Sequence, residues 1–274
     1  MRTPTKPLYD FLIRILGIFR SALYYNCSDK NGPGALAAQP EIMRGKLFMA
    51  EPETIAGQEA DHTAPCVFGP VPSRRLGLSL GVDMVPFKTC CYDCVYCQLG
   101  RTTHHTAQRR AWRPAAAIVS AVKDRLAHGP RPEFITLAGS GEPTLNSGIG
   151  TVIQGIKEFT DVPVAVLTNG ALLHLPEVRD EISGADLILP SIDAPDEKLF
   201  AQINQPAAGI AFDAMVQGLR DLRREFLGII WLEVFLINQV TTAGVPLAAM
   251  AEIARSIEPD KIQLNTAVRP TERE

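Results

Sequence analysis

Four of the six cysteines lie within eight residues, at Cys90, Cys91, Cys94 and Cys97. Such crowding suits a metal or cluster site better than disulfides between distant segments. Cys90, Cys94 and Cys97 form a C-x3-C-x2-C pattern. An iron–sulfur cubane normally takes four thiolates, so three leave one iron open, and an open coordination position is the mark of a catalytic centre. We therefore expect Cys90, Cys94 and Cys97 to hold an iron–sulfur cluster.

Zinc is the alternative for this loop. Cys91, Cys94 and Cys97 also form a C-x2-C-x2-C pattern, and four close thiols could bind a zinc ion. Zinc sites usually draw two ligand pairs from separated segments, and the adjacent His104 and His105 do not have that spacing. The sequence favours the cluster over zinc.

An alternation of strands and helices must position this loop. Short apolar runs that predict buried strands alternate with segments of helical periodicity. The predicted strands are Leu78–Val85, Phe134–Leu137, Val164–Leu167, Leu187–Leu189, Ile229–Ile237 and Lys261–Leu264. The predicted helices are Pro114–Ala127, Ile149–Phe159, Pro176–Ile182, Phe212–Phe226 and Pro246–Ile257. Such alternation predicts a parallel sheet with right-handed crossovers. Six units are too few for a closed eight-stranded barrel, so we expect an α/β fold, a partly open parallel (β/α)6 barrel.

Polar and glycine-rich segments follow the predicted strands. In parallel α/β folds the chemistry lies at the carboxyl ends of the strands. The cysteine loop follows the first strand, and three further segments follow the next three: Gly139-Ser140-Gly141-Glu142, Thr168-Asn169-Gly170 and Ser191-Ile192-Asp193. We expect these four loops to converge on one site.

The first 65 residues differ in character from the rest. Leu8 to Tyr25 is apolar but is interrupted by Asp10, Arg14 and Arg20, which argues against a transmembrane segment and allows a surface-bound amphipathic helix. Residues 26–65 have the composition of a linker. We therefore predict an N-terminal extension over 1–65 and a catalytic domain over 66–274.

Composition and charge bear on the class of protein, its partners and its compartment. Hydrophobic residues make up 46% and charged residues 21%, as in an ordinary globular protein, and the net charge of −3 indicates no particular partner. The positive charge is concentrated in one segment, however: the stretch from Arg74 to Lys123 contains eight Arg or Lys residues and two acidic residues. Thiolates bind a cluster most readily in a reducing compartment, so we predict a cytoplasmic protein.

The cysteine loop resembles that of the radical S-adenosylmethionine (radical SAM) superfamily, including an aromatic residue, Tyr96, just before the last cysteine. The segments Phe68 to Gly77, Phe87 to Thr89 and Cys94 to Gly100 resemble a narrower group. These are small iron–sulfur oxidoreductases related to the wyosine-forming enzymes that modify tRNA. Members of that group usually lack a cysteine where Cys91 stands, which supports Cys90 as the ligand.

The resemblance implies a [4Fe-4S] cluster, S-adenosylmethionine and a partial TIM barrel. It places the cofactor at Tyr96, at Gly139, Ser140, Gly141 and Glu142, and with less specificity at Asn169, Ser191 and Asp193. The physical reasons agree, since close backbone approach needs glycine and a carboxylate can accept hydrogen bonds from an ammonium group. Glu233 and Asn238 are weaker candidates.

The implied reaction is reductive cleavage of S-adenosylmethionine to a 5′-deoxyadenosyl radical, which abstracts hydrogen from the substrate. It requires an electron donor such as flavodoxin or ferredoxin, and no catalytic base or nucleophile is identified. The sequence does not identify the substrate. The basic segment from Arg101 to Arg113 and the resemblance suggest tRNA as one candidate substrate. Two other classes fit the cysteines, namely an iron–sulfur electron-transfer or sensing protein and a glycyl-radical activating enzyme.

Overall fold

The computed structural model describes residues 66–242 and 244–266, and the N-terminal extension predicted over 1–65, with its surface helix, lies outside them. In chain order the elements are β1 (Val67–Ser73), β2 (Gly77–Asp83), β3 (Thr89–Cys90), β4 (His104–His105), α2 (Ala115–His128), β5 (Phe134–Ala138), η1 (Pro143–Leu145), α3 (Ile149–Lys157), β6 (Val164–Thr168), α4 (Pro176–Ile182), β7 (Leu187–Ile192), α5 (Glu197–Ile203), α6 (Phe212–Glu225), β8 (Ile229–Phe235), α7 (Gly244–Ile257) and β9 (Lys261–Asn265).

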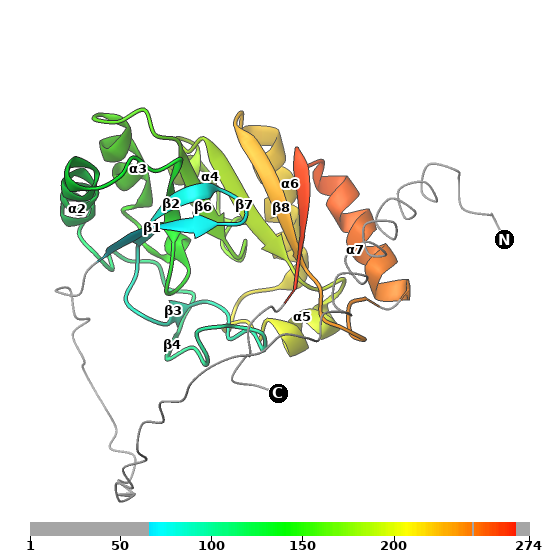
Figure 1. Cartoon of the computed structure of the whole chain (residues 1–274). Coiled ribbons are helices and arrows are strands. Elements are labelled where there is room, and N and C mark those ends of the chain that lie inside the picture. Colours follow the sequence, from blue (N-terminus) through cyan, green and yellow to red (C-terminus); the bar gives the residue numbers. More distant parts are fainter. Residues whose placement is uncertain (1–65, 243, 267–274) are drawn as a thin grey trace, which may run out of the picture. The chain divides into compact units, whose positions relative to one another are not determined.

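One sheet of seven strands organises the described residues, in the order β1-β2-β5-β6-β7-β8-β9 (Figure 1). From β2 to β9 every neighbouring pair is parallel, so spatial order follows chain order. Only β1 runs antiparallel, paired with β2. The edge strands β1 and β9 do not pair with each other, and the sheet is therefore open rather than a closed barrel.

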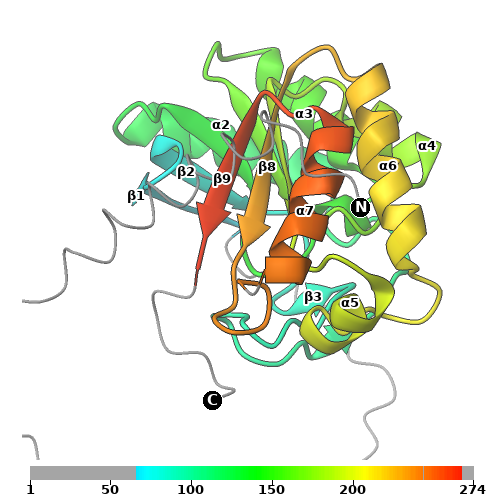
Figure 2. The ribbon, with the colours of Figure 1, turned by 90° about the vertical axis from the view of Figure 1, so that its right-hand side faces the viewer.

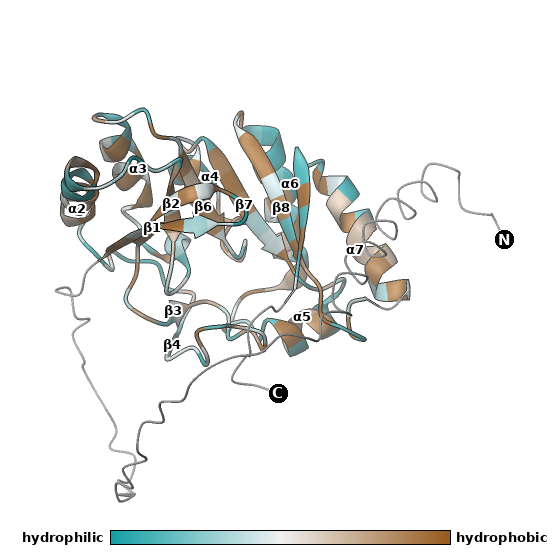
Figure 3. Cartoon of the chain, viewed as in Figure 1, coloured by the Kyte–Doolittle hydropathy of each residue, from teal (hydrophilic) through white to brown (hydrophobic). Residues whose placement is uncertain are grey.

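Helices cover the outer face of the sheet. Successive helices contact one another, α2 with α3, α3 with α4 and α6 with α7. Ile118 and Val122 of α2, and Ile153 and Ile156 of α3, are fully buried. Colouring by hydropathy shows strongly hydrophobic central strands beside helices of mixed character (Figure 3), as expected of strands covered on both faces.

The carboxyl ends of the strands point toward a small second layer of structure. The arrowheads of β8 and β9 point down toward α5 and β3 (Figure 2), and β3, β4 and α5 lie below the sheet in Figure 1 as well. The two-residue strands β3 and β4 pair in parallel, apart from the main sheet. The loops that follow the parallel strands therefore lie at one end of the sheet.

The six predicted parallel strands and the (β/α)6 order are confirmed. Strand β1 was not predicted, because Pro70 and Pro72 lower strand propensity, although an edge strand tolerates proline. Helix α5 was also missed, although the side chain of its N-cap, Asp196, accepts a hydrogen bond from the Leu199 N–H, which is a local start signal. Within the described residues no helix is long and apolar enough to cross a bilayer.

Candidate active site at the carboxyl ends of the strands

Backbone hydrogen bonds fix the cysteine loop over the end of β5. The Lys88 N–H donates to the Ser140 carbonyl at 2.8 Å, and the Glu142 N–H donates to the Thr89 carbonyl at 3.0 Å. A Cβ atom at Gly141 would lie 2.0 Å from the Thr89 carbonyl oxygen. Glycine is therefore required at 141 for the loop that carries Cys90 to pack this closely.

Glycine is required at position 139 for a second reason. Gly139 has φ +117°, a conformation that side chains rarely adopt, and a Cβ atom there would lie 1.9 Å from Asp83 Oδ1. That carboxylate accepts a hydrogen bond from the Ser140 N–H at 2.5 Å and from its hydroxyl at 3.2 Å. The glycine-rich segment is therefore shaped by its contacts with β2 and the cysteine loop.

A cavity of about 380 Å³ opens beside this loop. Its walls come from the cysteine loop and from the ends of β5, β6, β7 and β8. The lining residues are Arg75, Cys90, Cys94, Tyr96, Ala138, Gly139, Gly141, Glu142, Leu167, Thr168, Asn169, Leu189, Ser191 and Glu233. Thiols, a carboxylate, an amide and glycine backbone thus face one space.

Each thiol of the C-x3-C-x2-C pattern has a nitrogen donor. Asn204 Nδ2 lies 3.4 Å from Cys94 Sγ, Asn169 Nδ2 lies 3.6 Å from Cys90 Sγ, and Lys88 Nζ lies 3.6 Å from Cys97 Sγ. Hydrogen bonds of this kind to a cluster's sulfurs tune its reduction potential.

Cys91 is placed differently from its neighbours. Its side chain is fully buried, is absent from the cavity lining, and lies 3.2 Å from Asn169 Nδ2. Burial raises the pKa of the Cys91 thiol well above its usual value, and its hydrogen bond to Cys90 adds to the effect. The same hydrogen bond is the main cause that lowers the pKa of the Cys90 thiol. Of these two neighbouring thiols, Cys90 lines the cavity and Cys91 does not.

Cys94 lies in an acidic, buried setting. Burial raises the pKa of its thiol well above the usual range, and the charges of Asp193 and Cys90 raise it further. The raised pKa favours the protonated thiol. A bound metal would favour the thiolate instead, because a coordinating thiol is deprotonated outright.

Glu142 is fully engaged by the protein. Its carboxylate is 2% exposed and accepts hydrogen bonds from the Thr144 N–H (3.1 Å), the Thr144 and Thr168 hydroxyls (both 2.6 Å) and the Asn169 N–H (2.8 Å). Burial raises the pKa of Glu142, while these hydrogen bonds oppose the rise. The side chain caps η1, so it ties β5, β6 and the cavity wall together besides facing the cavity.

Tyr96 is held in place from two sides. Its ring stacks on Phe235 with centroids 3.8 Å apart and an interplanar angle of 14°. Its hydroxyl donates to Asp193 Oδ2 at 2.5 Å, and Asn204 Nδ2 donates to the same oxygen at 2.7 Å. Asp193 is 4% exposed, and burial raises its pKa. Asp193 therefore supports Tyr96 and Asn204 from behind the cavity wall.

Most of the predicted site residues meet in the cavity. Eight line it: Cys90, Cys94, Tyr96, Gly139, Gly141, Glu142, Asn169 and Ser191. Ser140 and Asp193 lie behind the wall, hydrogen-bonded to Asp83 and Tyr96, and Cys97 approaches Lys88. Of the weaker candidates, Glu233 lines the cavity and Asn238 does not.

Sequence reasoning missed two nitrogen donors to the cysteine sulfurs. The missed donors are Lys88 and Asn204. Lys88 has a positive φ of 59°, and Asn204 is the C-cap of the unpredicted helix α5. Within 101–113, Arg109 pairs with Glu181 and the Arg110 guanidinium lies 3.6 Å from the centroid of the Trp112 ring. No residue of 101–113 lines the cavity; its cationic lining residue is Arg75.

No three His, Cys, Asp or Glu side chains between residues 66 and 266, position 243 aside, gather as a single metal ion would require. A zinc ion holds its ligand atoms within about 2.0–2.3 Å of one point, whereas a cubane spreads its thiolates over different irons.

Comparison with known proteins gives the family. The profile of the Radical SAM superfamily matches residues 84–246. A UPF0026 protein of Synechocystis is 37% identical over 214 residues, which cover 76% of this chain and 77% of the relative. A UPF0026 protein of Methanocaldococcus jannaschii is 35% identical, with coverage of 74% and 64%. A Brachyspira hyodysenteriae protein named GTPase Obg is 44% identical over 76% of this chain, but the match spans only 31% of that protein.

Solved structures share the fold at low sequence identity. Streptococcus suis SuiB has a TM-score of 0.53 at 14% identity, with 70% of this chain and 41% of SuiB covered. Native anSMEcpe with bound AdoMet has a TM-score of 0.52 at 13% identity, with 72% and 53% covered. Radical SAM proteins use a [4Fe-4S] cluster and S-adenosylmethionine. This chain belongs to the radical SAM superfamily and, within it, to the UPF0026 proteins.

Proposed function

We propose that this protein is a radical SAM enzyme in which Cys90, Cys94 and Cys97 hold the [4Fe-4S] cluster. The observation that carries the proposal is the shared cavity, where Cys90 and Cys94 face Glu142, Asn169 and Ser191. Thiol ligands, nitrogen donors to each sulfur and polar groups from four strand ends fit a cluster with a polar small molecule beside it.

When bound, the cluster supplies one electron that cleaves S-adenosylmethionine to methionine and a 5′-deoxyadenosyl radical, which takes a hydrogen atom from the substrate. The chain's own residues bind and orient. Asn169 and Ser191 present polar groups to the cavity, and the stacked Tyr96 forms part of its wall. Leu167 and Leu189 keep part of the wall apolar, which limits water near the reacting atoms.

The external electron donor in this proposal is a flavodoxin or a ferredoxin, and the protein works in the cytoplasm, where thiols remain reduced. Transfer RNA stays a prediction as substrate. It has less support than the sequence suggested, because Arg109 and Arg110 are engaged with Glu181 and Trp112.

Anaerobic reconstitution with iron and sulfide, followed by dithionite and S-adenosylmethionine, tests the proposal. We expect the wild-type protein to form 5′-deoxyadenosine and Cys94→Ala to form none. Cys91→Ala is the matched control and is expected to retain the reaction, since that thiol lies outside the cavity lining. Formation of 5′-deoxyadenosine by Cys94→Ala would contradict the mechanism.

A further inference from the structure

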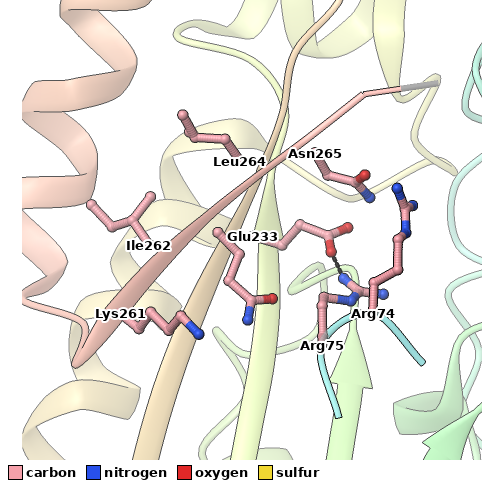
Figure 4. A pocket seen from close by; sticks show the side chains of 8 residues that line it. Arg74, Arg75, Glu233, Lys261, Ile262, Leu264 and Asn265 are labelled. Atoms are coloured by element: carbon pink, nitrogen blue, oxygen red, sulfur yellow. Dashed lines mark ion pairs between the residues drawn. The ribbon is translucent and has the colours of Figure 1, made fainter. Parts of the chain in front are cut away.

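A second cavity, of about 350 Å³, adjoins the first. The turn between β1 and β2 supplies Arg74 and Arg75, and β9 supplies Lys261 (Figure 4). Gln263 of β9 also lines this cavity. Arg75 and Glu233 line both cavities and form an ion pair where they meet. None of the five described cysteines lines the second cavity.

The charges in the second cavity do not balance. Three cationic side chains, Arg74, Arg75 and Lys261, face one carboxylate, Glu233. Among the described residues no carboxylate pairs with Arg74. Lys261 Nζ lies 4.4 Å from the centroid of the Trp231 ring and has no carboxylate partner within the described part of the chain. An excess of two positive charges therefore faces this space.

The two arginines are brought together by the turn between β1 and β2. The Ser73 hydroxyl accepts hydrogen bonds from the N–H groups of Arg75 (3.3 Å) and Leu76 (3.2 Å), which fixes the turn that carries both arginines. Burial lowers the pKa of Arg75, and the neighbouring charge of Arg74 lowers it further. A bound anion would relieve this repulsion.

The strand register adds a neutral acceptor. Glu233 pairs with Ser191 on one side and with Gln263 on the other, so these three residues form one row across β7, β8 and β9. Gln263 Oε1 is buried and has no hydrogen-bond partner among the residues that the structure describes. A buried acceptor without a partner costs free energy, and a ligand that brings a donor would remove that cost.

We infer that the second cavity binds the phosphate group of a small phosphate monoester, which is the substrate. The inference rests on the proposed function, because it places the substrate next to the cavity assigned to S-adenosylmethionine. Arg74 and Lys261 hold the phosphate, Gln263 accepts from a hydroxyl or amine of the substrate, and the rest of the molecule passes the Arg75–Glu233 pair toward Ser191.

Charge and geometry select this class of ligand. Two excess positive charges match a phosphate monoester dianion, whereas a carboxylate or a phosphodiester carries one negative charge. Arginine forks and a lysine ammonium are the usual partners of phosphate oxygens. The shared Arg75 and Glu233 place such a ligand in contact with both cavities.

Calorimetric titration of the full chain with ribose 5-phosphate, inorganic phosphate, acetate and tRNA tests the inference. We expect both phosphates to bind more tightly than acetate. The double variant Arg74→Gln/Lys261→Gln should bind ribose 5-phosphate at least about tenfold more weakly, because two charge-assisted contacts are lost. Lys261→Arg should keep most of the affinity, because it keeps the charge.

Lys198→Gln is the matched control, since Lys198 is exposed on α5 and lines neither cavity; its affinity should equal that of the wild type. Circular dichroism and each single variant separate lost binding from lost folding. Three results would overturn the inference: no phosphate binding by the wild type, equal affinity in the wild type and the double variant, or binding of tRNA without binding of ribose 5-phosphate.

The inference and the proposed function fail separately. A wild-type protein that cleaves S-adenosylmethionine but binds no phosphate overturns the inference alone. A protein that binds ribose 5-phosphate through Arg74 and Lys261 but never forms 5′-deoxyadenosine overturns the proposed reaction, and the second cavity then stands as a phosphate-binding site without a role in radical chemistry.

Discussion

Asn204 and Cys94 are 110 residues apart in the sequence, yet Asn204 Nδ2 lies 3.4 Å from Cys94 Sγ. Asn204 is the C-cap of α5, and its side chain is 1% exposed. The same Nδ2 donates to Asp193, which accepts from Tyr96. One amide thus links the cysteine loop to the ends of β7 and α5.

Replacement of Asn204 should change the redox behaviour of the cluster. A donor to a ligating sulfur stabilises the reduced, more negative state, so Asn204→Leu should lower the reduction potential. One hydrogen bond of about 1–1.4 kcal/mol corresponds to roughly 40–60 mV for a one-electron couple. A redox titration followed by electron paramagnetic resonance measures this. Asn238→Leu, at an exposed position after β8, is the control, and an unchanged potential in Asn204→Leu would remove Asn204 from this role.

The adjacent cysteines should behave differently on substitution. Cys90→Ala should lose the cluster, because one of three thiolate ligands is gone, whereas Cys91→Ala should reconstitute as the wild type does. Iron and sulfide content per chain, with the visible absorption spectrum, measures both. Loss of the cluster in Cys91→Ala together with retention in Cys90→Ala would reverse the ligand assignment.

Substitution of Glu142 should weaken the fold even without a cofactor. Glu142→Gln turns one acceptor oxygen into an NH2 group that faces the donors Thr144, Thr168 and Asn169. The expected loss in the free energy of unfolding is about 1–3 kcal/mol, measured by urea denaturation. Thr144→Val removes a single donor and should cost less, roughly 0.5–1.5 kcal/mol. If Glu142→Gln is as stable as the wild type, the hydrogen bonds around Glu142 do not support the cavity wall.

Acid should remove a contribution to stability made by Asp260. The Ile230 N–H, at 2.8 Å from Asp260 Oδ2, and then Arg223 hold the pKa of Asp260 below its usual value. The unfolded chain, where the pKa of an aspartate is about 3.9, therefore binds the proton more readily. The contribution is complete above that value and is lost as the pH falls through the lower, folded-state pKa.

Urea denaturation at neutral and acidic pH measures the effect for Asp260. The difference in free energy of unfolding between the wild type and Asp260→Asn should shrink as the pH falls. Arg223→Gln should change the acid dependence less, because it leaves the hydrogen bond from Ile230 in place. A difference that stays constant between the two pH values would refute the assignment.

The sequence by itself determined the cluster cysteines as candidates and the (β/α)6 order. Both are local signals, since ligand spacing is read within eight residues and apolar runs report strands that are buried on both faces. The convergence of Gly141, Glu142, Asn169 and Ser191 followed from one further rule, that parallel strands end on the same side.

Only the tertiary structure decided the partners of those residues. That Asn204 and Lys88 approach cysteine sulfurs, that Ser140 and Asp193 stand behind the cavity wall, and that Arg75 rather than the 101–113 segment faces the cavity depends on contacts between distant segments. Such contacts are set by sheet register and loop packing, and no local periodicity records them.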